Sequence, residues 1–192
     1  MWQVRLVVDF NGIVLFDPEV VSNHFNPLRR GTNLFKRFTT TEAGDEALAA
    51  GLFVPVLAID DSTYDIYLRF DDEPSRIDSQ LVLCESGPFA LRTAGSLVVA
   101  NLGALQYWNG IGDGNRLQWF KGFFLVRVRG FSSADLSTAG YEFVFTRTRK
   151  LARGSRTEGA RMRVLRLDEP RVLKPECLQD DELPVKPNPI GT

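Results

Sequence analysis

Two groups of carboxylates between positions 60 and 73 are the residues whose types and spacing could support chemistry. The first is Asp60-Asp61 with Asp65, and the second is Asp71-Asp72-Glu73. Closely spaced carboxylates can act as a general acid and base, or they can hold Mg²⁺. At the ends of strands, however, Asp and Glu more often form turns and keep the surface soluble. We expect this second role, and a carboxylate-based, metal-dependent hydrolase remains the alternative.

His24 is the only histidine of the chain. A metal site with several histidines and a mechanism with two are therefore excluded. Any Ser-His-Asp or Cys-His unit would have to use His24, but the sequence has no Gly-x-Ser-x-Gly turn to expose a nucleophile. We expect His24 to lie in a surface loop. Because no nucleophile, base and oxyanion donor come together, the sequence predicts a protein that is not an enzyme and has no cofactor or metal site.

A glycine-rich loop spans positions 109–115, with the sequence NGIGDGN. Its glycines are dense enough for a phosphate-binding loop, but no Lys-Ser/Thr pair follows them. Its alternating Asn and Asp are typical of calcium loops, but the downstream glutamate is missing. We expect a long connection whose glycines supply positive φ angles.

The charges are unevenly distributed. Positions 60–85 hold eight acids and two bases, whereas positions 147–166 hold eight bases and one acid. The two regions either pair with each other or form separate faces. The basic segment could bind phosphates, but no aromatic residues are interleaved for stacking on bases. An acidic protein partner and an exposed, solvated hairpin are the other interpretations.

The elements that position these residues are mostly strands. Alternating apolar residues and turn signals predict roughly ten short strands, which favours an antiparallel β-sandwich or a barrel-like domain. One short helix is expected at 42–50, capped by Thr40 or Thr41. The expected strands, in order, are 2–9, 12–16, 34–38, 52–59, 63–70, 80–84, 89–93, 96–100, 117–128, 141–149 and 161–167.

Turn dipeptides predict how these strands connect. Asn11-Gly12 predicts a hairpin, and Ala94-Gly95 predicts a second tight turn. Pro55 predicts an edge strand or a bulge, since proline cannot donate to a ladder. Asp17-Pro18 is expected to cap a short helical turn. The inward positions predict a core of Val4, Leu6, Ile66, Leu68, Val98, Phe124, Val126, Phe143 and Phe145.

Length and composition fit a single β-rich domain at 1–167 followed by an extended, proline-rich tail at 168–192. The 192 residues carry a net charge of −1, which favours neither nucleic acid nor a membrane as a partner. No apolar run is long enough to span a bilayer, and the N-terminus has no secretory pattern, so we expect a cytoplasmic protein. Cys84 and Cys177 have no metal-like spacing.

The strands between Phe89 and Phe131 carry a resemblance. A strand ends in Leu91-Arg92, a glycine-led strand follows at 95–99, and a strand with alternating valines runs from Gly122 to Val128. This order, over about a quarter of the chain, resembles the second half of small bacterial β-sandwich inhibitor and immunity proteins, such as the competence nuclease-inhibitor family. The resemblance implies a binding protein that masks another protein, such as a toxin or a nuclease.

We therefore expect a non-catalytic binding protein, an inhibitor or immunity protein for a bacterial toxin or effector. Toxins that act on nucleic acid are basic around their sites, so an inhibitor would present acids, with aromatic anchors close by. A structural component of a phage-like or secretion assembly is an alternative that predicts homo-oligomers. The expected partner-binding residues are Asp60, Asp61, Tyr64, Tyr67, Asp71, Asp72 and Glu73.

Overall fold

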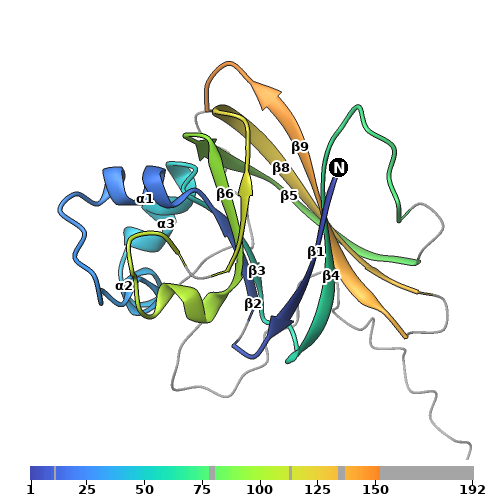
Figure 1. Ribbon diagram of the computed structural model, residues 1–192, viewed down its shortest axis with the longest axis horizontal. Coiled ribbons are helices and arrows are strands. Elements are labelled where there is room, and N and C mark those ends of the chain that lie inside the picture. The colour runs from blue at the N-terminus through green and yellow to red at the C-terminus, as the bar shows by residue number, and fades with distance from the viewer. Residues whose placement is uncertain (11, 78–80, 113, 134–136, 152–192) are drawn as a thin grey trace, which may run out of the picture.

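The computed structural model describes residues 1–10, 12–77, 81–112, 114–133 and 137–151. These residues form three layers, which are a five-stranded sheet, a four-stranded sheet and a set of three short helices (Figure 1). The predicted mainly β sandwich is confirmed, but the helical layer is larger than the single helix that the sequence indicates.

The five-stranded sheet has the order β1-β4-β9-β8-β5. Its neighbours are antiparallel except for β4 and β9, which run parallel with Asp65 opposite Gly140 and Phe70 opposite Phe145. The strands are β1 (Trp2–Val8), β4 (Ser62–Phe70), β9 (Ala139–Thr148), β8 (Gly122–Ser132) and β5 (Leu81–Thr93).

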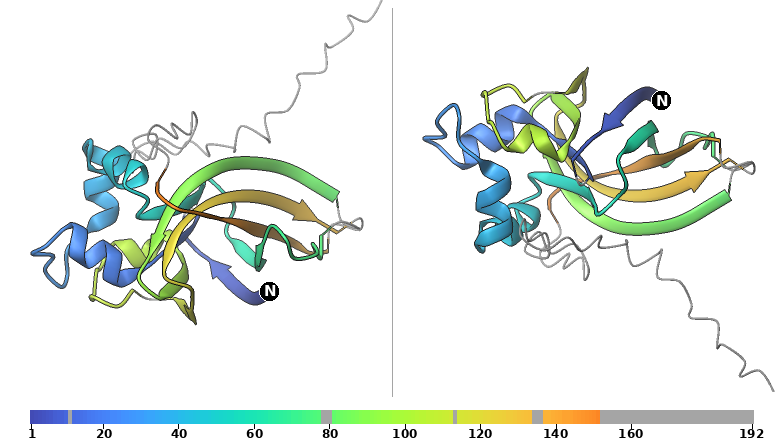
Figure 2. Two further views of the ribbon diagram at one scale, coloured as in Figure 1. Left: turned by 90° about the horizontal axis from the view of Figure 1, so that it is seen from above. Right: turned by 90° about the horizontal axis from the view of Figure 1, so that it is seen from below.

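The four-stranded sheet has the order β3-β2-β6-β7 and lies between the larger sheet and the helices (Figure 2). Its strands are β2 (Gly12–Phe16), β3 (Phe53–Leu57), β6 (Ser96–Asn101) and β7 (Asn115–Gln118). The helical elements are α1 (Pro18–His24), α2 (Leu34–Thr40), α3 (Ala43–Ala49) and a 3₁₀ turn η1 (Leu102–Leu105).

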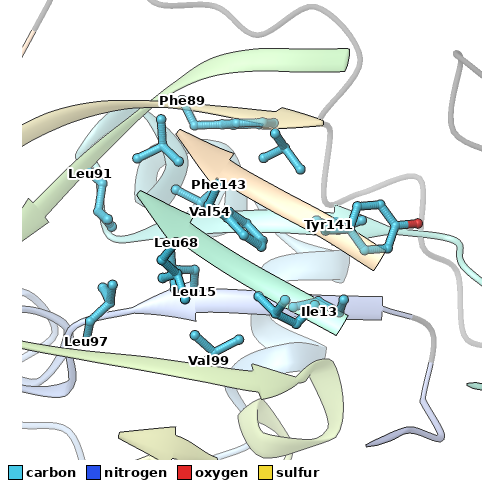
Figure 3. Close-up of a cluster of buried hydrophobic side chains, with 14 of the residues drawn as sticks. Ile13, Leu15, Val54, Leu68, Phe89, Leu91, Leu97, Val99, Tyr141 and Phe143 are labelled. Carbon is cyan, nitrogen blue, oxygen red and sulfur yellow. The ribbon is translucent and has the colours of Figure 1, made fainter. Parts of the chain in front are cut away.

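Two apolar cores hold the three layers together. The first lies between the sheets and contains residues of both, among them Leu15, Leu68, Val99 and Phe143 (Figure 3). The second lies between the small sheet and the helices. Every residue of β2 is buried, because a strand covered on both faces must be apolar at every position and not only at alternate ones.

The predicted core is correct for eight of its nine members, which are buried, while Val4 is only partly buried. Val98, however, belongs to the second core, because alternate side chains of β6 point to opposite faces of its sheet.

The predicted hairpin at Asn11-Gly12 is wrong, because its two strands belong to different sheets. β1 pairs with β4, whereas β2 pairs with β3 and β6, so the chain changes sheets near Gly12. β5 and β6 likewise belong to different sheets on either side of Ala94-Gly95. The predicted long strand 117–128 is divided in the same way into β7 and β8. A turn dipeptide predicts that the chain reverses its direction, but it does not determine whether the two flanking strands pair with each other.

Asp17 connects two of the places where the layers meet. Its buried carboxylate caps α1 by accepting from the backbone N–H groups of Glu19 and Val20 at 2.9 and 3.3 Å. The other oxygen accepts from the N–H groups of Ala94 and Ser96 at 2.7 and 3.1 Å. The predicted cap at Asp17-Pro18 is therefore confirmed, and the same side chain also fixes the corner between β5 and β6.

The segment around Phe35 and Phe38 is a helix, α2, and not the predicted edge strand. Asn33 caps it, with its side chain accepting from the Lys36 N–H at 2.7 Å, and Leu34, Phe35 and Phe38 are buried at helical spacing. Thr41 ends α2 and its hydroxyl accepts a hydrogen bond of 3.2 Å from the Ala43 N–H, but the N-cap residue of the next helix is Glu42 and not the predicted Thr40 or Thr41. The expected helix at 42–50 is present as α3.

Two further strand predictions have mixed outcomes. β3 contains Pro55 and is an edge strand, as predicted. Positions 80–84 and 89–93 were expected as two strands, but Leu81–Thr93 is one strand with register shifts near Val82 and Ser86.

The predicted strand 161–167 and the tail 168–192 lie outside the described residues. β9 is paired on both sides, so it has no free edge to accept a hairpin partner over Gly140–Phe145.

Candidate protein-binding surface

The expected partner-binding residues are divided between the two ends of β4. Asp60 and Asp61 precede this nine-residue strand, and Asp71, Asp72 and Glu73 follow it. At about 3.3 Å per residue, the two groups are about 30 Å apart. β4 is also an internal strand with β1 and β9 on either side, so these residues do not form the single strand edge that the sequence indicates.

The first end of β4 is acidic. β1 ends with Val8 opposite Ser62, so Asp9 lies beside the exposed Asp60-Asp61 turn. The Tyr64 side chain points into the first core, and its hydroxyl donates to the Asp60 carbonyl at 2.9 Å. Burial raises the pKa of Tyr64, and the charges of Asp60 and Asp61 raise it further. The negative charges of Asp60 and Asp61 therefore act on the buried side chain of Tyr64.

Tyr64 and Tyr67 lie on opposite faces of the sheet, as residues three apart in a strand must. Tyr67 is half-buried on the outer face, where its ring stacks on Phe131 with the centroids 5.6 Å apart. Asp65, on the same face, makes an ion pair of 3.0 Å with Arg5 of β1. Because Asp65 is engaged in this way and points away from Tyr64, it does not complete a carboxylate site with Asp60 and Asp61.

At the second end of β4, two of the three acids have structural partners. Asp71 accepts a hydrogen bond of 2.7 Å from the hydroxyl of Thr146 in β9. Glu73 accepts from the Phe70 N–H at 2.8 Å and from the ammonium of Met1 at 3.0 Å. The bond from Phe70, followed by those to the N-terminus, lowers the pKa of Glu73. Asp72 is exposed.

An aromatic cluster adjoins these acids, and we call it the aromatic end. It consists of Phe70, Trp119, Phe120 and Arg147. The rings of Phe70 and Trp119 are stacked at 5.5 Å, and Phe70 meets Phe120 edge-on at the same distance. The guanidinium of Arg147 lies over the ring of Phe120, 4.5 Å from its centroid. The cluster thus combines the side-chain types that are enriched in binding hot spots.

Phe120 is 45% exposed although the backbone around it is fixed. The Thr93 hydroxyl donates to the Phe120 carbonyl, and the Trp119 N–H donates to the Gly95 carbonyl at 3.0 Å. These bonds fasten the β7–β8 connection to the β5–β6 corner. The sequence does not single out Phe120, because its pattern predicts one strand over 117–128, whereas the structure breaks it between Gln118 and Gly122; Arg147 is likewise not indicated as part of this cluster.

A buried ion-pair network occupies the outer face of the large sheet. Glu142, which is fully buried, lies 2.9 Å from Arg69 Nε and 2.8 Å from Arg129 Nη1, and it accepts from the Ser75 hydroxyl at 2.7 Å. Arg69 also donates to the carbonyl oxygens of Phe70 and Glu73. The network therefore fastens the 71–77 segment over the sheet, a role that the alternating pattern of β9 did not reveal.

The remaining candidate residues have structural roles or none. His24 is exposed at the end of α1. In the loop 109–115, Gly110, Gly112 and Gly114 have positive φ angles, as predicted. A Cβ at Gly112 would come within 2.7 Å of the Phe16 ring, so this glycine allows the loop to pack closely. Among the described residues, no group of His, Cys, Asp or Glu could hold a metal ion.

No protein-family model matches this chain, and no curated protein matches it in sequence. Two solved structures have a similar arrangement. One is the crystal structure of ComJ, inhibitor of the DNA-degrading activity of NucA, from Bacillus subtilis. It has a TM-score of 0.47 and 11% identity, covering 77% of this chain and 96% of that chain. The other is described as crocagin biosynthetic gene J, with the same TM-score and coverage and 12% identity.

One of these two structures is thus described as a nuclease inhibitor, the kind of protein that the sequence resembles. A likeness at this TM-score and identity transfers neither an activity nor a site residue to this chain. In the part of the chain that the structure describes, no helix is long and apolar enough to cross a membrane.

Proposed function

We propose that this protein is a non-catalytic binding protein that masks another protein, in the manner of an inhibitor or immunity protein for a toxin or effector. The observation that carries the proposal is the aromatic end, where an exposed phenylalanine is presented on a fixed backbone beside Arg147 and exposed carboxylates. An anchor that is already ordered loses little conformational entropy on binding.

The chemistry of the aromatic end suits a partner with an apolar pocket bordered by basic residues. Phe120 would enter the pocket, while Asp71 and Asp72 would face the basic border. The proposed contacts retain four of the five acids expected from the sequence, leave out Glu73, Tyr64 and Tyr67, and add Phe120 and Arg147. Asp60 and Asp61, at the other end of β4, would act over a longer range by steering a basic partner during the encounter.

Affinity capture from the native host with the full chain as bait, followed by mass spectrometry, tests the proposal. The wild type should capture a protein that Phe120→Ala fails to retain. Gln118→Ala is the matched control, since Gln118 is also exposed but precedes the cluster. The proposal is wrong if both variants capture the same proteins as the wild type.

Once a partner is identified, association kinetics separate anchoring from steering. Phe120→Ala should raise the dissociation rate, since loss of a buried aromatic anchor acts on the bound state. Asp60→Ser with Asp61→Ser should lower the association rate at low salt but not at high salt, because salt screens exposed charges. Equal association rates at low salt would contradict the steering role.

One observation favours a second candidate, a component of a homo-oligomeric assembly. The outer half of β5 is at the edge of its sheet and exposes Leu81, Val82 and Leu83. Exposed apolar edge strands can pair with another chain. Light scattering on the purified protein distinguishes the two, since the assembly predicts oligomers without any partner. Oligomers that Val82→Lys returns to monomers would support this candidate over the inhibitor.

A further inference from the structure

The helical layer carries a surface with a charge opposite to that of the β4 ends. Between Ser22 and Thr41 the sequence has four basic residues and no acid. All four are exposed, and none makes an ion pair with another described residue. The nearest carboxylates along the chain are Glu19 of α1 on one side and Glu42, which precedes α3, on the other. We call this surface the basic helical face, and it consists of Arg29, Arg30, Lys36 and Arg37.

Backbone pairing fixes the loop that carries the two arginines. Thr32 forms an isolated antiparallel bridge with Trp108, whose N–H donates to the Thr32 carbonyl at 3.1 Å. The Gly31 N–H donates to the Trp108 carbonyl at 2.7 Å. Trp108 itself is buried in the second core. The loop is therefore fastened to the interior, and its arginines project from a fixed backbone.

The same bridge places exposed apolar groups beside these bases. Tyr107 precedes the bridge and is 74% exposed, because its buried neighbour Trp108 turns the other way. Ile111 follows in the glycine-rich loop and is 57% exposed. Arg30 lies against Gly110, since its Nε would be 4.0 Å from a Cβ at that position. Among the described residues the exposed Tyr107 ring contacts no other ring, and the bridge holds its segment next to the loop that carries the exposed Arg29 and Arg30.

We propose that the basic helical face binds single-stranded nucleic acid. Four exposed cations without a carboxylate partner among the described residues match the spaced negative charges of a phosphate backbone, and one of them, Arg37, also lies over the Phe25 ring at 4.8 Å. The exposed ring of Tyr107 offers a face on which an unpaired base can stack, which a duplex does not provide. A helix of seven residues, as α2 is, does not resemble the longer recognition helices that enter a major groove.

This inference is independent of the proposed function. The aromatic end and the basic helical face use different residues on different layers. Binding of a protein partner through Phe120 neither requires nor prevents binding of nucleic acid at the basic helical face. Each proposal can therefore fail without affecting the other.

Fluorescence anisotropy of the full chain with a labelled twelve-nucleotide oligothymidine, at 50 mM salt, tests the inference. Arg29→Gln with Arg30→Gln should weaken binding at least about fivefold and reduce the salt dependence by about 1.4 units of log K per log salt, for two lost phosphate contacts. Tyr107→Ala should weaken binding about fivefold or more without changing the salt dependence, because stacking releases no counterions.

Two controls locate the binding. Arg92→Gln removes an exposed base of β5 and should change little. Replacing Arg153, Arg156, Arg161 and Arg163 with Gln tests the other basic part of the sequence, and binding should persist. Circular dichroism of each variant shows whether it is folded.

Three outcomes would overturn the inference. The first is no binding of oligothymidine at 50 mM salt. The second is equal binding of a duplex of the same length with no effect of Tyr107→Ala, which would indicate a general polyanion surface. The third is competition by polyglutamate at the same charge concentration, which would indicate an acidic protein as the partner.

Discussion

Glu142 shows how a single buried charge can organise an exposed sheet face. It has no exposed surface and meets two guanidinium groups and one hydroxyl. Burying an ion pair costs desolvation free energy, but removing one member leaves its partners buried and unpaired.

We expect Glu142→Ala to lower the free energy of unfolding by about 3–5 kcal/mol, because Arg69 would remain buried without its carboxylate. Urea denaturation measures this. Glu85→Gln is the control, since Glu85 is half-exposed, meets Arg127 at 3.3 Å and reaches Arg129 of the network only at 3.8 Å, so its loss should cost less than about 1 kcal/mol. Similar losses for the two variants would contradict the account of the network.

Glu73 gives a pH-dependent prediction at the same scale. The hydrogen bond from Phe70 lowers its pKa in the folded protein, so the folded state binds a proton less readily than the unfolded chain. The stabilisation is therefore present above the unfolded pKa, about 4.3, and is lost as the pH falls through the lower folded value.

Glu73→Gln should consequently destabilise the protein at pH 7, and the difference from the wild type should shrink as the pH falls below about 4. Thermal unfolding at a series of pH values measures it. Asp72→Asn, at the exposed neighbouring position, should show no such trend. A Glu73→Gln difference that stays constant from pH 7 to pH 3 would exclude the proposed linkage.

At the scale of elements, substitutions in β8 give the most direct test of the predicted alternation between buried and outward-facing side chains. Phe124 is buried between the sheets, where its ring meets Phe145 edge-on at 6.0 Å. Phe123 points to the other face and is only half-buried.

Phe124→Ala should therefore lower the free energy of unfolding by about 3–5 kcal/mol, as expected for truncation of a buried aromatic side chain. Phe123→Ala, in the same strand and with the same change of side chain, should cost clearly less. Chemical denaturation of the two variants compares them. The order of the two losses matters more than their size, and the reverse order would mean that the core lies on the other face of β8.

For the whole molecule, a carboxylate-based metal enzyme is a further alternative to the proposed function. Asp60 and Asp61 lie on a turn, and Asp65 is paired with Arg5 on the outer face. The three carboxylates therefore do not converge on one point.

Calorimetric titration of the protein with Mg²⁺, Mn²⁺ and Ca²⁺ should accordingly show no binding tighter than about 100 µM, since tighter oxygen sites need several converging ligands. Binding that is tighter than this, and that Asp60→Asn or Asp61→Asn abolishes, would favour the hydrolase and weaken the proposed inhibitor function.

Most of the strands, most of the inward positions and the helix cap at Asp17 were predictable from sequence because they depend on local patterns. Alternation of apolar and polar side chains identifies a half-buried strand such as β4, and an Asp-Pro pair identifies the start of α1. The role of the glycines in the loop 109–115 was also correct, since a positive φ is a property of one residue.

Only the tertiary structure decided which strands pair, because pairing joins residues far apart in the chain. Tight turns at Gly12 and Gly95 lead into a different sheet, and β4 and β9 meet in parallel across more than 70 intervening positions. The candidate surfaces follow from these pairings. Phe120 meets Phe70 and Arg147 where the chain passes from β7 in one sheet to β8 in the other, and the segment of Tyr107 lies next to the loop of Arg29 and Arg30 because Trp108 bridges to Thr32. Local sequence carries no information about such encounters, since they depend on how the layers stack.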